Sequence, residues 1–240
     1  MTDKCVMLPT IDAGQIARSI AQRTTNSNIQ AQLLFLPGQY LLATTQGDIT
    51  TYKLLSPNDL KAAFTGEPVD SGFLSANTIR WGTSYLGEYV VQYYPPQKYG
   101  MTLTDIKGGD LVVLTVPMPG LVFMGCGSSY WVWALKEEVS ASTQLYHAPL
   151  PNVESLGSIC FGTLNPNKSS ASGMSQIWEL LWATPFNSHT VQHKSKKYPV
   201  DVRSHLIELH NKKSRKYPVK DLLPLQYNLQ EAIHAINSQH

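Results

Sequence analysis

The first quarter of the chain passes from a helical to a strand-like pattern of apolar residues. Residues 11–22 place small and apolar side chains on one face behind Asp12, which predicts a short amphipathic helix capped by the aspartate. Ser56 and Pro57 predict the start of a second short helix, because serine caps a first turn and proline is favoured at its first position. Between them, apolar segments bounded by turn residues predict a small β-meander, with strands at 32–36, 40–45 and 49–55.

The middle of the chain combines loop-like and strand-like composition. From residue 69 to 109, glycine, proline, serine and aromatic residues dominate, which predicts ordered loop around one strand at 88–94. Both alternating faces of 130–135 are apolar, so each face of that strand should meet other protein. We expect an antiparallel sheet of three strands in quick succession, at 110–116, 121–126 and 130–135.

Helical spacing dominates the last third. The apolar residues of 174–182 recur at i, i+3 and i+4, which predicts a helix that ends before Pro185. The sequence Lys-Tyr-Pro-Val occurs at 197–200 and 216–219, and we interpret it as a duplicated helix-entry element, since two copies are too few for a repeat fold. The second copy leads into apolar spacing over 222–236, which predicts a terminal helix. Four tryptophans are expected to pack the core between sheet and helix: Trp131, Trp133, Trp178 and Trp182.

Composition limits the class of protein. With 240 residues and 42% hydrophobic content, the chain can bury a full core. Cys5, Cys126 and Cys160 are an odd number and form no C-x-x-C pair, which argues against a disulfide framework and a zinc site and predicts a reducing, cytoplasmic setting. We expect Cys126 to be structural and Cys5 to be a terminal bystander. The longest apolar stretch, 111–124, contains prolines and a glycine, so no membrane span is expected.

The charges and histidines gather towards the C-terminus. Residues 190–240 hold nine lysines and arginines against four aspartates and glutamates, although the net charge of the chain is only +2. We favour a solvated face over a nucleic-acid site for this segment. His205 and His210 miss the i, i+4 spacing of metal ligands by one residue, so we expect them to face solvent on a helix. The sequence therefore predicts no metal and no cofactor.

One motif carries chemistry. Pro151-Asn152 is followed by Gly157-Ser158-Ile159-Cys160, with eight residues from the asparagine to the cysteine, and then by a polar loop and an amphipathic helix. This order resembles the ubiquitin-conjugating-enzyme family, which has the same spacing from asparagine to cysteine. The resemblance covers about residues 110–189.

Within that family the chain is most similar to the divergent prokaryotic branch, in particular to protein B of the PRTRC plasmid cassette. Residues 145–152 and 157–162 carry this similarity. It implies an α+β, ubiquitin-conjugating-enzyme-like fold with an antiparallel β-meander and flanking helices, extended at both termini. The implied partners are a ubiquitin-like protein, a ThiF-like activating enzyme and a JAB-type peptidase. The expected domains are an N-terminal α/β part at 1–68, the conjugating core at 69–189 and a basic helical extension at 190–240.

The resemblance also assigns roles to residues. Cys160 would carry the modifier as a thioester, and Asn152 would either stabilise the oxyanion of lysine transfer or hold the loop by backbone hydrogen bonds. Asn187, Ser188 and His189 occupy the region where the family often gates the incoming lysine, although a polar helix exit explains them equally well. Leu150 stands where the family usually has histidine, so the resemblance supports thioester formation more strongly than lysine transfer.

Three classes of function follow. The favoured one is a conjugating enzyme that accepts a ubiquitin-like protein on Cys160 and transfers it to an amine. The missing histidine favours an inactive relative that serves as a binding scaffold in a plasmid or defence cassette. The basic region 194–220 would suit a nucleic-acid-binding accessory protein.

Overall fold

The computed structural model describes residues 31–36, 39–47, 49–60, 70–104 and 111–238. The chain forms two compact units, residues 1–70 and 71–240. The helix predicted at 11–22 and the bystander Cys5 lie outside the described residues.

The first unit contains the predicted meander. Its strands pair antiparallel in the order β1 (Ala31–Leu36), β2 (Gln39–Gln46) and β3 (Ile49–Leu55), which confirms the three strands. The helix start at Ser56 is also confirmed. Ser56 Oγ accepts the Asp59 N–H at 3.1 Å, and the Asp59 carboxylate accepts the Ser56 N–H at 3.1 Å, so the helical turn at 57–60 has a reciprocal cap.

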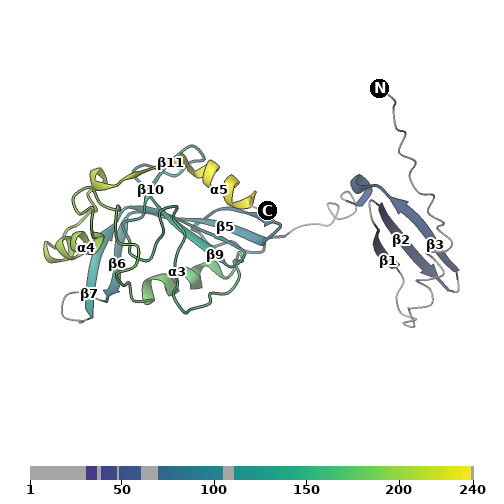
Figure 1. Cartoon of the computed structure of the whole chain (residues 1–240), viewed down its shortest axis with the longest axis horizontal. Helices are drawn as coiled ribbons and strands as arrows, with labels where there is room; N and C mark the ends of the chain where they lie inside the picture. The colour runs from purple at the N-terminus through teal and green to yellow at the C-terminus, as the bar shows by residue number, and fades with distance from the viewer. Residues whose placement is uncertain (1–30, 37–38, 48, 61–69, 105–110, 239–240) are drawn as a thin grey trace, which may run out of the picture. The chain divides into compact units, whose positions relative to one another are not determined.

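The second unit is built on a six-stranded sheet in the order β11-β10-β9-β8-β5-β4 (Figure 1). Every neighbouring pair in it is antiparallel. Its strands are β4 (Thr78–Ser84), β5 (Gly87–Tyr94), β8 (Gly120–Cys126), β9 (Ser129–Leu135), β10 (Gln144–His147) and β11 (Pro224–Asn228).

A bent two-stranded ribbon extends this sheet. β6 (Gln97–Leu103) pairs antiparallel with β7 (Val112–Met118), and the register continues across the bend, since Tyr94 pairs with Leu121 and Gln97 with Met118. Pro95, Pro96 and Pro119 lie at the bend, where the missing N–H groups interrupt the ladder of hydrogen bonds.

Two predictions for this region were wrong. The segment 69–109 is not one strand within a loop, because β4 and β6 are strands as well. The three strands predicted after residue 110 are present, and β8 pairs antiparallel with β9, but β7 does not join them, because it pairs with β6. The proline-rich sequence before Gly120 is a bend in a nearly continuous strand and not a hairpin turn.

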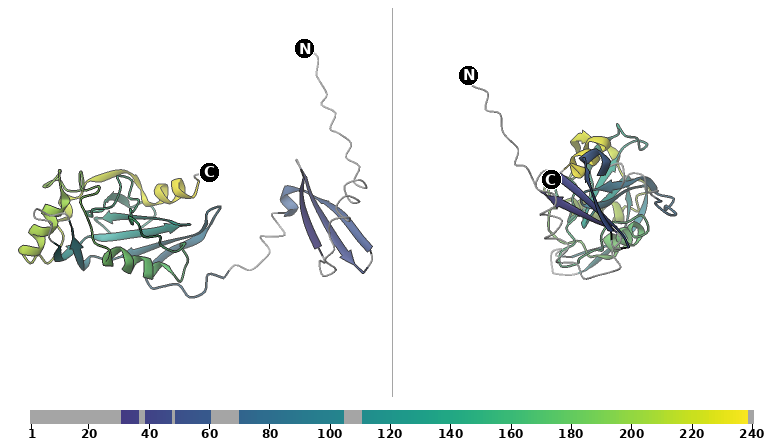
Figure 2. Two further views of the ribbon diagram at one scale, coloured as in Figure 1. Left: turned by 60° about the horizontal axis from the view of Figure 1, so that its bottom comes forward. Right: turned by 90° about the vertical axis from the view of Figure 1, so that its right-hand side faces the viewer.

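Helices cover both faces of the sheet. α3 (Met174–Ala183) and α5 (Leu229–Asn237) lie on opposite faces, and α4 (Val202–Asn211) packs beside β7 (Figures 1 and 2). α3 confirms the predicted helix, and its Trp178 stacks on Tyr94 with ring centroids 4.0 Å apart. β9 lies inside the sheet, and its two faces meet different clusters: Val132 packs into the core cluster of α3, and Trp133 packs into that of α5. This confirms the prediction that both faces of this strand contact other protein.

The C-terminal prediction needs correction. The apolar spacing over 222–236 is not one helix but β11 followed by α5, and Asn228 and Glu231 form the capping box at their junction. The second Lys-Tyr-Pro-Val copy enters only a 3₁₀-helix, η1 (Val219–Asp221). The tryptophans were predicted to pack one core between sheet and helix, but Trp133 lies on the face of the sheet that α5 covers, whereas Trp178 and Trp182 lie on the opposite face.

The described elements of 190–240 share the sheet and both core clusters of the second unit. The division into parts at residues 68 and 189 stays a prediction. No helix in the described part of the chain is long and apolar enough to cross a membrane.

Candidate active site

The eight-residue spacing from Asn152 to Cys160 closes a small hairpin. The Cys160 N–H donates to the Asn152 carbonyl at 2.8 Å, and the Glu154 N–H donates to the Ser158 carbonyl at 2.7 Å. The Gly157 N–H donates to the Glu154 carbonyl at 2.9 Å and forms the turn at the tip. Asn152 and Cys160 therefore face each other across the base of the hairpin.

This hairpin, residues 152–160, is hydrogen-bonded to residues 130–132 of β9, next to the part of β9 that pairs with β10. The Val132 N–H donates to the Gly157 carbonyl at 2.9 Å, and the Ile159 N–H donates to the Tyr130 carbonyl at 2.8 Å. Gly157 has a φ of +94°, and a Cβ there would lie 2.2 Å from the Trp133 indole nitrogen. Only glycine fits this position, so the turn and the indole together set the height of the hairpin on the sheet.

The two described cysteines differ in access. Cys160 is exposed, whereas Cys126 is buried at the end of β8, as expected of a structural cysteine. An exposed thiol is open to an incoming acyl group, and the buried one is not.

Asn152 connects the hairpin to the segment after α3. Its φ is +58°, a left-handed conformation that asparagine tolerates better than other residues with a Cβ. Its N–H donates to the His189 carbonyl at 2.9 Å, and its Oδ1 accepts the Asn187 N–H in a long bond of 3.4 Å. Cys160, Asn152, Asn187 and His189 are thus linked by hydrogen bonds, with the exposed Ser188 between the last two.

Around this loop, Leu150 contributes a buried apolar side chain and Lys194 a buried ammonium. Leu150 is fully buried in the core cluster of α3, so its side chain offers no polar contact. The Lys194 Nζ, in contrast, donates to the Val153 carbonyl, next to Asn152. Burial lowers the pKa of Lys194 to about 8, although Glu154 opposes this shift. Sequence reasoning missed Lys194, because nothing in its polar neighbourhood marks a buried lysine.

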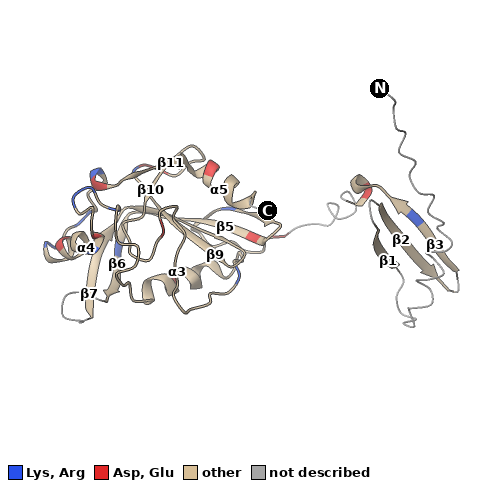
Figure 3. Ribbon diagram, viewed as in Figure 1, with Lys and Arg blue, Asp and Glu red and all other residues tan. Residues whose placement is uncertain are grey.

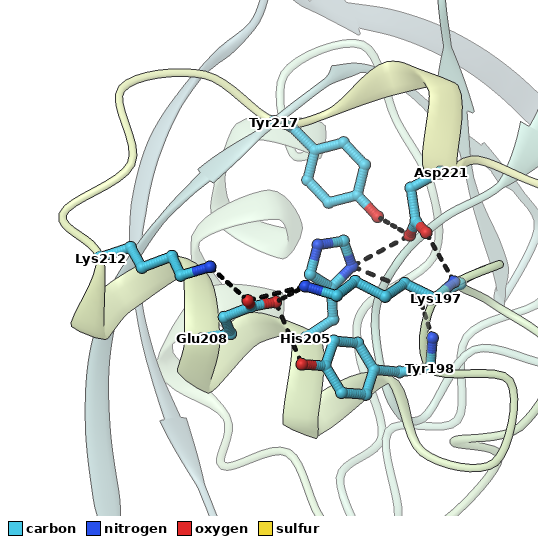
Figure 4. A network of polar contacts seen from close by, with 8 residues as sticks. Lys197, Tyr198, His205, Glu208, Lys212, Tyr217 and Asp221 are labelled. Atoms are coloured by element: carbon cyan, nitrogen blue, oxygen red, sulfur yellow. Dashed lines mark hydrogen bonds and ion pairs between the residues drawn. The ribbon is translucent and has the colours of Figure 1, made fainter.

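A second polar cluster, around α4, does not have the geometry of a catalytic triad (Figure 4). His205 is buried, contrary to the solvent-facing prediction, because Asp221 and Ser195 satisfy its ring. Its Nδ1 lies 3.0 Å from the Asp221 carboxylate and 3.3 Å from the Ser195 hydroxyl. A triad needs serine and aspartate on different ring nitrogens, so this contact is structural. Burial lowers the pKa of His205, and the opposing effect of Asp221 is smaller.

The basic C-terminal segment is partly neutralised by its own acids. Lys197 and Lys212 each lie 2.6 Å from the Glu208 carboxylate, and acidic residues interrupt the basic ones over α4 (Figure 3). His210 is also engaged, since its Nδ1 accepts the Thr115 N–H at 3.0 Å. Among the described residues, no group of three or more His, Cys, Asp or Glu is placed to hold a metal ion.

Comparison with protein families decides the class. The model of prokaryotic E2 family D matches residues 51–225, more than half of the chain, and the match includes the whole hairpin. The chain belongs to prokaryotic E2 family D. The E2-like membership confirms the resemblance to prokaryotic conjugating enzymes, and E2 proteins in general work with a ubiquitin-like protein and an activating enzyme. The mixed α/β fold with antiparallel sheets agrees with an E2-like α+β class. No curated protein and no solved structure matches the chain.

Proposed function

We propose that this E2 family D protein accepts a ubiquitin-like protein from a ThiF-like activating enzyme as a thioester on Cys160 and passes it to an amine. The observation that carries the proposal is the hairpin, which holds an exposed cysteine across from Asn152. Within the family we further propose the branch of PRTRC protein B, a JAB-type peptidase as an additional partner, and a reducing, cytoplasmic setting that keeps the thiol free.

The first step exchanges one thioester for another. The Cys160 thiolate attacks the carbonyl carbon of the modifier's C-terminal glycine, which is attached to a cysteine of the activating enzyme. The new S–C bond forms as the old one breaks, and the activating enzyme's cysteine leaves as a thiolate. Because sulfur replaces sulfur, the step needs no dedicated imidazole base. The exposure of Cys160 leaves room for the incoming thioester.

The second step transfers the modifier to nitrogen. A neutral amine attacks the Cys160 thioester, an oxyanion develops on the carbonyl oxygen, and the intermediate collapses to an amide as Cys160 leaves as a thiolate. The proton lost by the amine passes to solvent. Since the Asn187 N–H engages Asn152 Oδ1, the Nδ2 group of Asn152 is the donor left for the oxyanion.

Asn187, Ser188 and His189 are proposed to line the path of the amine. Their support is the attachment of this segment to Asn152 and the hydrogen bond of 2.8 Å from the His189 N–H to Asn187 Oδ1. That bond forms a tight local turn, so the segment is ordered beside the hairpin.

A charging assay tests the carrier role. The purified protein is incubated with ATP, the activating enzyme and the ubiquitin-like protein encoded with it, and adducts are resolved with and without a reducing thiol. Wild type and the Cys126→Ala control should form a reducible adduct, and Cys160→Ala should form none. A normal adduct on Cys160→Ala would refute the proposal.

The buried Leu150 favours one alternative, an inactive E2 relative that serves as a binding scaffold. Such a scaffold would bind the modifier or activating enzyme stably but would never become charged. The same assay, combined with a pull-down of the two partners, separates these functions.

A further inference from the structure

A cavity of about 440 Å³ lies between the hairpin and the segment 188–194 that follows α3. Its walls come from the end of β10, from 153–155 and from 188–194. Four of its lining residues are lysine or histidine: His147, His189, His193 and Lys194. Glu154 is the one carboxylate among its lining residues. The cavity therefore presents more potential positive charge than its own walls neutralise.

Lys194 is the anchor of this cavity. Its side chain is only 2% exposed, and within the described chain its ammonium donates to one acceptor, the Val153 carbonyl. An ammonium has three N–H donors, so two remain for a ligand on the cavity side. A buried cation without an equal counter-charge is costly, and the lowered pKa of Lys194 reflects this cost.

Other residues that line the cavity also indicate that its described walls lack enough negatively charged or hydrogen-bonding partners. Burial lowers the pKa of His147, and the charges of Lys194 and His193 lower it further. The Thr190 hydroxyl is buried with no hydrogen-bond partner in the described part of the chain. Thr190 and His193 also have left-handed backbones, with φ of +49° and +57°. Such strain persists where the surrounding structure holds it, and it is concentrated at functional sites.

We propose that this cavity binds an oxyanion, the carboxylate or phosphate group of a ligand, with the Lys194 ammonium as its main donor. An oxyanion would satisfy the free ammonium donors and would favour protonation of the neighbouring imidazoles. The inference goes beyond the proposed carrier function, since it needs neither the modifier nor the activating enzyme.

The experiment uses the full chain and inorganic phosphate. Phosphate replaces chloride at constant ionic strength and pH, and NMR follows the ring signals of His147 and His193, assigned with single His→Asn variants. The expected result is a saturable shift of both signals, weaker at about pH 8.5 than at about pH 6.5, because Lys194, whose pKa is lowered to about 8, loses its proton between these two values. A parallel titration with acetate tests whether a carboxylate alone is enough.

Substitutions of lysine distinguish specific binding of phosphate in this cavity from general attraction of anions to the basic surface. Lys194→Met should weaken phosphate binding by about tenfold or more, as expected for a lost charge-assisted hydrogen bond. Lys194→Arg should retain binding, and the exposed Lys196→Met control should bind as wild type does. A shift that stays linear in phosphate, or one of equal midpoint in folded Lys194→Met, would overturn the proposal. Because no charging reaction is involved, failure here leaves the carrier function untouched, and the reverse also holds.

Discussion

At the scale of single residues, Asn152 combines a left-handed backbone with a side-chain amide, and substitutions can separate the two. Asn152→Gly keeps the backbone conformation and removes the amide, whereas Asn152→Ala removes the amide and adds strain. Both variants should lose amine transfer by roughly 10²–10³-fold, because each lacks the oxyanion donor. Asn152→Ala should also be less stable than Asn152→Gly by about 1–2 kcal/mol.

The measurements are the rate of single-turnover discharge to free lysine and the free energy of unfolding in urea. Thioester formation on Cys160 should persist in the glycine variant, since the first step needs no oxyanion donor from Asn152. If Asn152→Gly discharges at the rate of wild type, the amide has no catalytic role and Asn152 only shapes the loop.

Lys194 predicts an unusual dependence of stability on pH. Its pKa is lowered from 10.5 to about 8 in the folded chain, so between these values the unfolded state binds more protons. The contribution of Lys194 to stability therefore rises as pH increases from about 8 to about 10, by at most ~3 kcal/mol. Urea unfolding should show this rise for wild type relative to Lys194→Met. Parallel pH profiles for the two proteins would contradict the burial of the ammonium.

The position of Cys160 opposite Asn152 could be expected from the sequence, because a spacing of eight residues is a local property that also closes the hairpin. The role of Cys160 as the nucleophile stays a prediction. The partners of Asn152 were harder to predict. The resemblance indicated Asn187 and His189, and the structure links their backbones to Asn152. Lys194 and the burial of His205 could not be predicted, since each depends on a residue brought close only by tertiary packing.

At the scale of elements, the hairpin depends on a glycine that leaves room for an indole. Gly157→Ala would place a Cβ against Trp133 at a left-handed position, at a cost of about 2–4 kcal/mol. Gly162→Ala is the matched control, because Gly162 also has a positive φ, +64°, but nothing lies within 4 Å of its Cβ position.

The midpoint of thermal unfolding and the rate of thioester formation should both fall more for Gly157→Ala than for Gly162→Ala, because only Gly157→Ala pushes the hairpin away from Trp133 of β9. Equal effects of the two substitutions would show that Trp133 does not determine the placement of the hairpin.

Elements with a regular pattern were predictable, and those with a mixed pattern were not. α3 and the two apolar faces of β9 followed from spacing alone. β4 and β6 each carry a glycine and several polar residues, which concealed the pairing of β4 with β5 and of β6 with β7. Over 222–236, the leucines recur at near-helical spacing, but the segment around Leu225 also fits a strand in which buried and exposed residues alternate. The boundary between β11 and α5 lies at Asn228, whose side chain caps the helix.

At the scale of the whole molecule, the second unit contains its own core. All described members of both hydrophobic clusters lie between Trp81 and Ile236. A shortened chain of residues 71–240 should therefore fold cooperatively, with a circular dichroism melting transition close to that of the second unit in the full chain. Loss of a cooperative transition would show that residues 1–70 complete the fold. Since the family match begins at residue 51, the shortened chain should also be compared with the full chain in charging.

The proposed carrier function requires a covalent bond between the modifier and the side chain of Cys160. Changing Cys160 to serine replaces sulfur by oxygen and leaves the rest of the hairpin unchanged. The way in which the adduct is cleaved then shows whether the modifier is bound as a thioester or as an oxyester. Wild type should give an adduct that a reducing thiol cleaves, and Cys160→Ser should give an oxyester that resists thiol and is cleaved by hydroxide. Intact mass spectrometry measures both. An adduct on Cys160→Ser that a reducing thiol still cleaves would place the bond elsewhere and contradict the account.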